Sequence, residues 1–537
     1  MKEMTAHGDR PAPNPLGSRS PVLGTNGMVA SSQPLASVAA LRVLQEGGNA
    51  VDAAITAAAV LNVVEPMMTG IGGDMFAIVY MQQEAKPVAI NGSGWSGSKA
   101  AIDYFRSRNA DRIPDGICSV SVPGAVAGWF KLHQRYGRLP MARLLAPAIE
   151  YADNGFPVSE IIAGQWQRAE ALLRKTADAA RTYLIDGRAP RHGDVFRSPD
   201  LARSLKLIAQ NGRDEFYKGE IARTIVEFSD RMGGLLTLDD LSDFDAQWVE
   251  PVSTNYRGFD VYELGANTQG IAALEMLNLL EGYDLRSLGH NSAEYLHLLV
   301  EAKKLAWADR DSYIADPDKV HVPAGQLISK AYAAERRKLI DRSRSQPSVR
   351  PGLCEDGDTV YLTVVDKDRN AVSFINSLFQ SFGSGLVAGN TGIALQNRGV
   401  LFELDPSHPN HVAPRKRPFH TLIPAMVLKD GKPFFSYGVM GGDMQPQGHV
   451  QVLLNLVDFG MDPQQAGDAP RFRHSVGGLA LESAFNEPVR SGLAAKGHDI
   501  VSGFDAFGGY QGILIDPGTN VLVGGSDVRK DGLAIGW

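Results

Sequence analysis

Cysteine is almost absent from this sequence, which excludes a fold held together by disulfide bonds. The 537 residues include two cysteines, Cys118 and Cys354, which lie far apart and form no metal-binding spacing. Small secreted domains that depend on disulfides carry many more cysteines. The cysteine content is therefore compatible with a reducing compartment.

Long apolar runs are missing as well. The first 24 residues are rich in Pro, Gly, Ser and Arg, and they lack the apolar core of about 7–15 residues that a secretory signal needs. The longest apolar stretch, residues 50–64, contains Asp52 and Asn62 and is shorter than the roughly 20 residues of a membrane-spanning helix. We therefore expect a cytoplasmic protein without a membrane partner, and a disordered tail over residues 1–27.

Neither sign of charge dominates the composition. Lys and Arg total 53, Asp and Glu total 60, and the net charge is −7. A nucleic-acid binder would usually show a basic stripe, so we expect no nucleic-acid partner. Hydrophobic residues at 44% and charged residues at 21% are typical of a globular protein and argue against general disorder.

Hydrophobic periodicity predicts a mainly helical first part of the chain. Residues 51–64 are almost wholly Ala, Val, Ile and Leu, and a helix that is apolar on all sides is a buried one. The predicted helices cover residues 34–46, 51–64, 129–136, 141–154, 159–175 and 292–311, and the predicted strands cover residues 28–32, 75–80 and 256–262.

The character of the sequence changes after residues 342–358. This segment, RSRSQPSVRPGLCEDGD, has no periodicity and is typical of an exposed, flexible connection. The residues that follow predict a strand over 359–365, a turn, and a returning strand over 371–379. We therefore predict a mainly helical part, residues 28–358, and a sheet-rich part, residues 359–537, that share one core.

Thr359 stands where the flexible connection ends and the strand begins. A threonine hydroxyl is a poor nucleophile without a base, but the first residue of a chain can use its own α-amine for this purpose. The pKa of a free α-amine is about 7.7–8.0, which suits a base at neutral pH. Cleavage between Asp358 and Thr359 would create such a residue, although threonine at the start of a strand also has a purely structural explanation.

Two glycine-rich stretches could bring backbone N–H groups to a ligand. Gly441 and Gly442 follow a predicted strand, and such a pair can stabilise the oxyanion of an acyl-transfer intermediate. An ordinary turn would show the same pattern. Residues 69–74, TGIGGD, precede a strand instead of opening a helix, so they give little support to a nucleotide site, and we expect no cofactor.

Metal-binding motifs are poorly represented. No His-Glu-x-x-His occurs, and His408 and His411 lie in a loop rich in Pro and Asn. The acidic cluster between residues 309 and 318 does not match the spacing of an EF-hand loop. We interpret this cluster as a solvated face and a capping region, expect no metal, and regard a metal-dependent hydrolase as the disfavoured alternative.

Several short segments, taken in order, resemble the γ-glutamyltranspeptidase family of N-terminal-nucleophile hydrolases over residues 29–537. The segments are QEGGNAVDAA at 45–54, Glu65-Pro66, GIGGD at 70–74, SVPG at 121–124, YRG at 256–258, ADR at 308–310, Asp358-Thr359, Arg417-Pro418 and APRF at 469–472. Each segment is short, but their order and spacing over so much of the chain are specific.

The resemblance implies an α/β fold, built as a four-layer αββα sandwich, and self-cleavage between Asp358 and Thr359. Thr359 would then be the nucleophile and, through its α-amine, the base. Gly441 and Gly442 would form the oxyanion hole. Ser377 stands where the family carries a second hydroxyl, which would orient the nucleophile by a hydrogen bond.

The segments that hold the glutamyl group in this family are changed here. Where the family has an arginine in the large subunit, this chain has NGSGW at residues 91–95. Where the family holds the α-amine with an asparagine, a glutamine and an aspartate, this chain has Phe379, Arg398 and Leu401. A leucine cannot pair with an ammonium group, and a cation would repel it. We therefore expect the glutamyl pocket to be dismantled.

Other residues could bind substrate in the changed pocket. The guanidinium of Arg398 fits a carboxylate bidentately, with a structural ion pair as the alternative. His420 and Thr421 replace a paired serine motif of the family and, with Ser377 and Arg398, complete the predicted substrate-binding set. These changes resemble the amidase and acylase branch of the family, which includes oxamate amidohydrolase.

The sequence thus predicts a self-processing amidohydrolase that cleaves an amide bond through a threonyl acyl-enzyme, with acyl transfer to an amine as a second outcome. Glutathione-type γ-glutamyl compounds are the family default, and a small carboxylate-bearing amide such as oxamate, or an acylated side chain, is the alternative that the pocket changes favour. An uncleaved metabolite-binding protein is the alternative from another class, but it would need neither the Asp358-Thr359 pair nor the two glycines.

The expected partners follow from this prediction. The substrate is a small-molecule amide, and the large and small fragments of one precursor stay associated, because neither part would bury its apolar face alone. The sequence leaves open whether two processed pairs form a homodimer.

Overall fold

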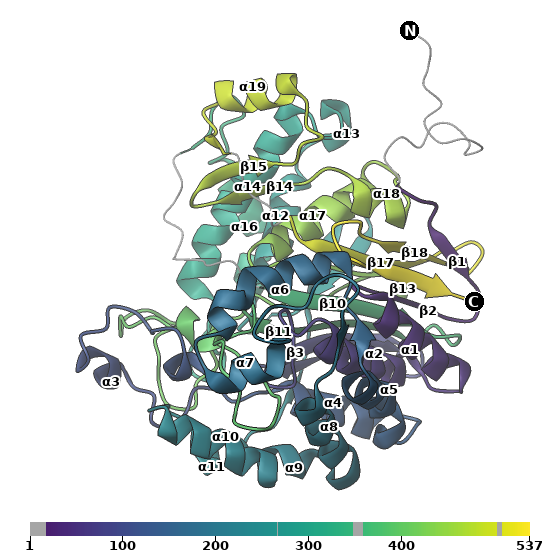
Figure 1. Ribbon diagram of the computed structural model, residues 1–537. Helices are drawn as coiled ribbons and strands as arrows, with labels where there is room; N and C mark the ends of the chain where they lie inside the picture. Colours follow the sequence, from purple (N-terminus) through teal and green to yellow (C-terminus); the bar gives the residue numbers. More distant parts are fainter. Residues whose placement is uncertain (1–17, 266, 347–357, 502–506) are drawn as a thin grey trace.

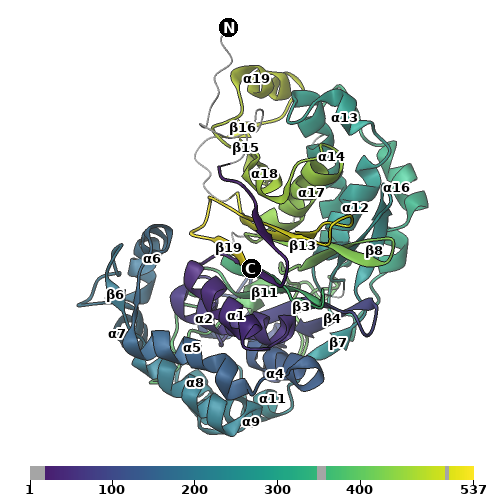
Figure 2. The ribbon, with the colours of Figure 1, turned by 90° about the vertical axis from the view of Figure 1, so that its right-hand side faces the viewer.

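Two stacked antiparallel sheets form the centre of the molecule (Figures 1 and 2) in the computed structural model, which describes residues 18–265, 267–346, 358–501 and 507–537. The sheet named here the β13 sheet has the order β1 (Val22–Gly24), β18 (Leu522–Ser526), β17 (Gly509–Ile515), β13 (Lys432–Met440), β12 (Ala425–Lys429), β9 (Phe259–Glu263) and β8 (Val252–Tyr256). The β10 sheet has the order β19 (Leu533–Gly536), β2 (Met28–Ser31), β10 (Asp358–Val365), β11 (Ala371–Phe379), β3 (Asp74–Met81), β4 (Lys86–Gly92) and β7 (Gln247–Val249).

Helices cover the outer face of each sheet, which gives the predicted αββα layers (Figure 2). The β10 sheet packs against α1 (Pro34–Gln45), α2 (Ala50–Val64), α4 (Ala125–Tyr136), α5 (Met141–Asn154) and α8 (Pro199–Asn211). The β13 sheet packs against α12 (Gly270–Leu280), α14 (Ala293–Tyr313) and α17 (Met444–Val457). Among the helices of the described residues, none has the combined length and apolar character that crossing a bilayer requires.

The remaining elements connect and flank these layers. They are α3 (Ile102–Arg106), η1 (Ile117–Ser119), β5 (Phe156–Pro157), α6 (Glu160–Leu173), α7 (Ala177–Tyr183), β6 (Val195–Phe196), α9 (Arg213–Tyr217), α10 (Glu220–Arg231), α11 (Leu238–Ser242), α13 (Leu285–Leu288), α15 (Ala324–Leu327), α16 (Lys330–Arg337), η2 (Arg398–Leu401), α18 (Pro463–Asp468), β14 (Phe472–Ser475), β15 (Gly478–Leu481), α19 (Glu487–Ala495) and β16 (Ile500–Val501).

Helix α2 is the buried helix that the sequence predicts. All 15 of its residues are buried, and it packs against α1, α5 and β10. Its first turn is fixed by a capping box, in which Asn49 accepts from the backbone of Asp52 and the Asp52 side chain accepts from the backbone of Asn49. The box satisfies N–H groups that would otherwise be unpaired at a buried helix end.

An apolar layer between the two sheets holds β10 against β13. Tyr361 and Ile375 from one sheet meet Met426 and Ile513 from the other. Thr363 and Ser436 add a hydroxyl–hydroxyl hydrogen bond of 2.6 Å across the layer. Because β10 packs directly against β13, the start of β10 and the end of β13 are held in fixed relation.

Both sheets combine strands from the two sides of Thr359. The β13 sheet takes β1, β8 and β9 from before this residue, and the β10 sheet takes β2, β3, β4 and β7 from before it. The predicted helical part and sheet-rich part therefore differ in their content of helices and strands, but they do not form separate layers.

Most predicted elements correspond to elements of the structure, with two differences. The strand predicted over residues 256–262 is only partly correct. Residues 259–262 lie in β9 and Tyr256 ends β8, but Arg257 and Gly258 have φ values of +51° and +87° and form the turn of the β8–β9 hairpin. Residues 22–24, inside the predicted disordered tail, form β1 and pair with β18. Residues 1–17 of that tail and residues 347–357 of the predicted flexible connection lie outside the described residues.

Candidate functional site

Thr359 lies at a β-bulge near the start of β10. Asp358 pairs with Phe379 and Val360 with Asn376, so the register shifts at the intervening residue. Bulges re-aim the side chains of a strand. The Thr359 side chain is buried, and its hydroxyl donates to Ser377 Oγ at 3.4 Å. The predicted neighbour of the nucleophile is thus the residue that Thr359 contacts.

Ser377 connects Thr359 to Arg398. Its Oγ also accepts from the backbone N–H of Phe379 at 2.7 Å and from Nη2 of Arg398 at 3.2 Å. Phe379 has a φ of +82°, an unfavourable conformation for a residue with a side chain. The strained end of β11 is therefore held by a hydrogen bond to the hydroxyl that contacts Thr359.

Arg398 is a fully buried cation. Its Nη1 donates to Thr421 Oγ1 at 2.9 Å, and its guanidinium lies 4.3 Å from the centre of the Phe379 ring. Burial lowers the pKa of Arg398 to about 9, and the nearby Asp74 carboxylate opposes this shift. Burial raises the pKa of Asp74 to about 6, against the attraction of Arg398. The two charges offset part of the cost of burying each other.

His420 belongs to the same buried group. Its Nε2 lies 3.0 Å from Oδ2 of Asp74, and its Nδ1 accepts from the backbone N–H of Leu422 at 3.3 Å. Burial, and secondly Arg398, lowers the pKa of His420 well below its usual value. His420 is therefore neutral, with its proton on Nε2 and donated to Asp74.

Gly441 and Gly442 form the turn between β13 and α17. Their φ values are +120° and +55°, which favour glycine. Within the described part of the chain, the N–H groups of these two residues have no hydrogen-bond acceptor. Gln269 supports the turn from behind, since its Nε2 donates to the carbonyl oxygens of Gly442 at 2.9 Å and Thr421 at 2.7 Å.

A cavity of about 530 Å³ brings Thr359 and Gly441 together. Helix α6 forms one wall, and Met440, Gly508, Arg529 and Lys530 lie around the remainder, with Thr359 and Gly441 between them. Such a volume is ordinary for a small-molecule site. Ser377, Arg398, His420 and Thr421, by contrast, are buried and absent from the cavity wall.

The residues at the positions that the family resemblance assigns to a glutamyl pocket are engaged with other parts of the protein. Phe379 and Arg398 are fully buried and stacked. Leu401 packs into an apolar cluster with Ile271 and Phe419. In the NGSGW segment, Asn91 donates to the side-chain oxygen of Asn267 at 2.9 Å. Within the described residues these side chains therefore serve contacts in the protein interior, and the loss of the glutamyl pocket stays a prediction.

Sequence reasoning missed the support beneath the glycine turn. Arg310 Nη1 donates to Oε1 of Gln269 and to Oδ1 of Asp443, both at 2.9 Å. Arg310 was noted within the ADR segment at 308–310, but its partners lie 41 and 133 positions away. No local pattern could have shown that this arginine holds the turn.

The acidic cluster between residues 309 and 318 is only in part the solvated face that the sequence predicted, since Asp318 is exposed and Asp311 is partly exposed. Asp309 and Asp316 are buried. Asp309 pairs with Arg336 at 3.2 Å, and Arg417 pairs with Asp318 at 2.8 Å. Arginines from distant segments compensate these carboxylates, which explains how an acidic run can enter the interior.

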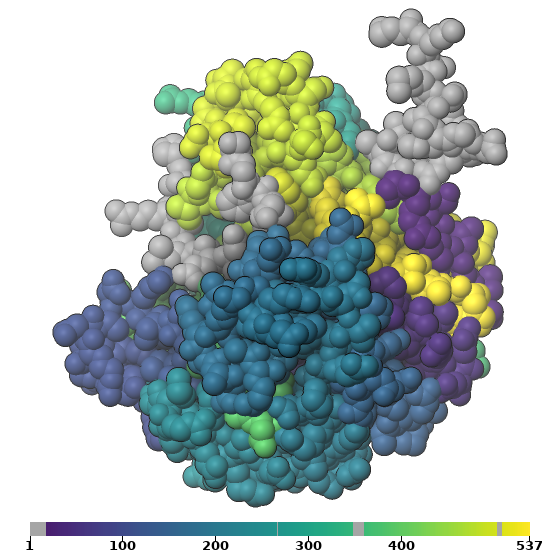
Figure 3. Space-filling model, in the orientation of Figure 1, coloured from purple at the N-terminus to yellow at the C-terminus, as the bar shows by residue number. Residues whose placement is uncertain are grey.

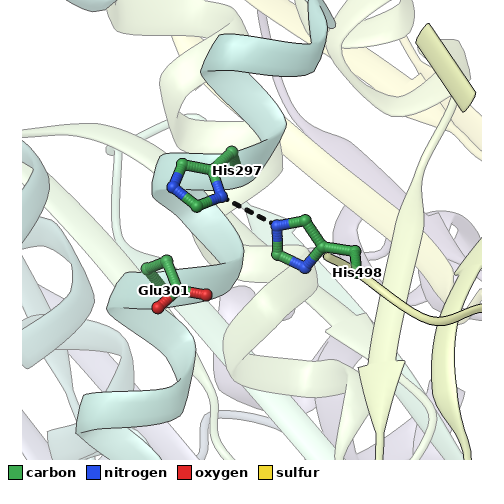
Figure 4. Close-up of side chains that lie close together, drawn as sticks. All are labelled: His297, Glu301 and His498. Carbon is green, nitrogen blue, oxygen red and sulfur yellow. Dashed lines mark hydrogen bonds between the residues drawn. The ribbon is translucent and has the colours of Figure 1, made fainter. Parts of the chain in front are cut away.

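One group of potential metal ligands occurs among the described residues: His297 and Glu301 on α14, with His498 (Figure 4). The Nδ1 of His297 and the Nε2 of His498 share a hydrogen bond of 2.8 Å, and His297 Nε2 donates to the backbone oxygen of Asp341 at 2.7 Å. Lys304 binds Glu301 at 2.7 Å. Each ligand atom thus has a protein partner, and we assign the group a structural role that ties residues 341–346 to α14.

Comparisons with known proteins agree with this geometry. A family model described as gamma-glutamyltranspeptidase matches residues 36–537. The glutathione hydrolase-like YwrD proenzyme of Bacillus subtilis (strain 168) is 41% identical over 96% of this chain and 99% of its own length. The oxamate amidohydrolase proenzyme of Klebsiella pneumoniae is 36% identical over 96% and 99%. The crystal structure of cephalosporin acylase from Bacillus halodurans is similar at a TM-score of 0.92 and 42% identity, over 98% of this chain and 99% of that one.

Proposed function

The chain belongs to the γ-glutamyltranspeptidase family, and from this we propose that Thr359, freed as an N-terminal residue by self-cleavage, is the nucleophile of an amidohydrolase. The observation that carries the proposal is the shared cavity, in which Thr359 lies beside Gly441. A nucleophile next to unpaired N–H donors is the arrangement that amide cleavage requires.

The proposed maturation uses the bulge at Thr359. The hydroxyl of Thr359 adds to the carbonyl carbon of Asp358, and the peptide C–N bond breaks as the nitrogen takes a proton. One water molecule then hydrolyses the resulting ester, which leaves a carboxylic acid on Asp358 and a free hydroxyl and α-amine on Thr359. Ser377, which already accepts from the hydroxyl, fixes the direction of attack.

The proposed turnover reuses the same atoms. The α-amine of Thr359 takes the hydroxyl proton while Oγ1 attacks the carbonyl carbon of a substrate amide. The N–H groups of Gly441 and Gly442 stabilise the oxyanion, and the departing amine receives the proton. Water attacks the acyl-enzyme in the same way and releases the acid, and an amine in place of water would give acyl transfer.

Among substrate classes, the geometry supports an acylase or small-amide hydrolase better than a γ-glutamyl hydrolase. Phe379, Arg398 and Leu401 occupy the region where a glutamyl group would be held. Relatives with high coverage are named oxamate amidohydrolase and acylase as well as glutathione hydrolase, so the choice between these classes rests on the geometry. Cleavage of glutathione would require a different mode of binding, in the cavity beside α6.

Arg398 is proposed to position the nucleophile and not to bind substrate directly. Its two Nη groups donate to Thr421 and Ser377, and it lies outside the cavity wall. Through Ser377 it holds the hydroxyl of Thr359. His420 contributes by donating to Asp74, the carboxylate that faces Arg398.

The two fragments are proposed to remain one molecule after cleavage. Each sheet needs strands from both sides of Thr359, so separation would expose the edges and apolar faces of both. The names of the relatives as proenzymes support this maturation. A cytoplasmic location stays a prediction.

Maturation is tested by the intact masses of the purified full-length protein, beside Thr359→Ala and Thr359→Ser. We expect two fragments cut between Asp358 and Thr359 in the wild type, one uncut chain in the alanine variant, and at least partial cleavage in the serine variant, which keeps a hydroxyl. A wild-type chain that stays at full length would contradict the proposal and favour a metabolite-binding protein.

A further inference from the structure

The wall of the cavity beside Thr359 carries more cations than carboxylates. It contains four cations and a single carboxylate, Glu482; the cations are Arg168, Arg473, Arg529 and Lys530. Cations that line a concave site raise the local concentration of anions. A ligand can bind most readily to those cations that have no partner within the protein.

Two of the four cations have partners within the protein. Arg529 binds Glu482 through two nitrogens and Asp527 at 3.0 Å, and its Nη groups also reach the carbonyl oxygens of Gly467 and Ala469. Arg473 is buried and engaged in contacts with its surroundings. These two arginines and Glu482 form the fixed base of the cavity.

Arg168 and Lys530 remain available. Arg168 is exposed and Lys530 is half-buried, and neither side chain has a hydrogen bond or an ion pair with any described residue. The charge of Lys530 also acts over a longer range on the buried carboxyl of Glu65, whose pKa it lowers against the larger effect of burial. Arg168 lies with Ile161, Gln165 and Leu172 on the face of α6 that borders the cavity, at the three- and four-residue spacing of one helix face. The guanidinium of Arg168 therefore borders the cavity, although it is also in contact with solvent.

Lys530 lies close to the glycine turn. A Cβ atom added to Gly509 would be 2.5 Å from Lys530 Cγ, so the lysine stem covers Gly509. Gly509 pairs with Met440, the residue before Gly441. In the space-filling view, the blue surface around α6 adjoins the yellow surface of the C-terminal strands (Figure 3). Arg168 and Lys530 therefore border the cavity from two different parts of the chain.

We propose that Arg168 and Lys530 form a subsite for a carboxylate that the substrate carries away from the scissile amide. The inference rests on the proposed function, because it assigns the position of the substrate relative to Thr359. A cavity of about 530 Å³ leaves room for a spacer between the amide at the glycine turn and an anion at the two cations. The preferred substrates are thus amides with a distant carboxylate on the acyl or the amine half.

The test uses processed enzyme and two matched pairs of amides. Glutaryl-4-nitroanilide and pentanoyl-4-nitroanilide differ by a carboxylate on the acyl half, and N-acetyl-4-aminobenzoate and acetanilide differ by one on the amine half. We expect wild type to prefer the carboxylate member of at least one pair. Arg168→Gln and Lys530→Met should each reduce that preference in kcat/KM by about fivefold, as expected for a partly exposed ion pair.

Lys175→Met is the matched control, since Lys175 is exposed just beyond the end of α6 and outside the cavity wall. It should leave the preference unchanged. Arg168→Lys should retain much of the preference, because it keeps the charge. Equal losses for both members of each pair, or no change in preference in either variant, would overturn the subsite.

A binding measurement separates this inference from the proposed function. Calorimetry with glutarate and with pentanoate reports the subsite without turnover, and we expect glutarate to bind more tightly in wild type but not in Lys530→Met. If Thr359→Ala kept full activity while this difference persisted, the nucleophile would be wrong and the subsite right. Turnover of amides through Thr359, with equal binding of glutarate and pentanoate and no preference for N-acetyl-4-aminobenzoate over acetanilide, would contradict the subsite alone.

Discussion

The two sides of Thr359 differ in burial and in the state of their charges. On the enclosed side, Ser377, Phe379 and Arg398 are fully buried and bonded to one another. On the cavity side, Arg168 is exposed and Lys530 half-buried, and neither forms a hydrogen bond or an ion pair with a described residue. A buried, hydrogen-bonded group can fix a hydroxyl in one direction, whereas solvated cations can bind a ligand. The same residue type, arginine, therefore positions the nucleophile on the enclosed side and binds the substrate on the cavity side.

Removing the hydroxyl of Thr359, which lies between the enclosed side and the cavity side, should lower the activity more than any other change. We expect Thr359→Ala to lower turnover of any amide substrate by at least about 10⁴-fold, as loss of a nucleophile does in other hydrolases, and to abolish self-cleavage. The checks are the steady-state rate and the intact mass. Activity within tenfold of the wild type would mean that neither side acts through Thr359.

Distorting the oxyanion turn should have the next largest effect. Gly441 has a φ of +120°, and an added Cβ would lie 3.1 Å from the Cα of Gly508. We expect Gly441→Ala to reduce kcat by about 10²–10³-fold, because a displaced N–H donor costs about 3 kcal/mol of barrier.

Gly431→Ala is the control for this substitution. Gly431 also has a positive φ, of +75°, but an added Cβ there meets nothing within 4 Å. It should lower stability by about 1 kcal/mol through backbone strain and leave kcat unchanged. A comparable fall in kcat for both variants would attribute the effect of Gly441→Ala to strain.

A change on the enclosed side should separate positioning from substrate binding. Arg398→Met removes a fully buried cation that faces Asp74, and we expect the free energy of unfolding to fall by about 3 kcal/mol. We also expect kcat to fall about tenfold as Ser377 loses its orientation, with little change in KM. Arg415→Met removes a partly exposed arginine paired with the buried Asp240, and it should cost less stability than Arg398→Met, because Asp240 keeps its hydrogen bonds from Ser98 and Thr237.

The outcome in KM decides the role of Arg398. A large rise in KM for carboxylate-bearing amides, with kcat preserved, would restore Arg398 as a direct ligand of the substrate. It would also contradict the division of labour between the two sides.

The pH dependence of stability should show the smallest effect. The pKa of Asp74 is about 6 in the folded protein and about 3.8 without the fold. Between these values the folded state binds more protons, so the contribution of Asp74 to stability falls as pH rises. Asp74→Asn removes this titration, and the unfolding free energy of the variant minus that of the wild type should rise by about 1–3 kcal/mol from about pH 4 to about pH 7. Urea unfolding at several pH values measures it, and a constant difference would contradict the buried charge pair.

Local patterns in the sequence were sufficient for the elements around Thr359. The strand after the linker, its hairpin partner and the buried helix α2 follow from β-branched and apolar patterns. The strand predicted over residues 256–262 is interrupted near its start, because the turn there depends on Arg257 in a left-handed conformation, which an apolar pattern does not reveal.

The site itself was only partly accessible from the sequence. The contact of Thr359 with Ser377, and the position of Gly441, agree with what the family resemblance implied. The support of the turn by Gln269 and Arg310, and the approach of Arg168 to the same cavity as Lys530, depend on contacts between distant segments. The burial of Arg398 also follows from tertiary packing and not from its neighbours in the chain.

The most direct test of the account is to find where the acyl group resides during turnover. Processed enzyme would be mixed with glutaryl-4-nitroanilide or acetanilide, quenched with acid within the first turnover, digested, and analysed by mass spectrometry. The account predicts an acyl adduct on Oγ1 of Thr359, at the first residue of the peptide that begins the small fragment. Turnover with the adduct on another residue, or an N-terminal peptide that begins elsewhere than Thr359, would contradict it.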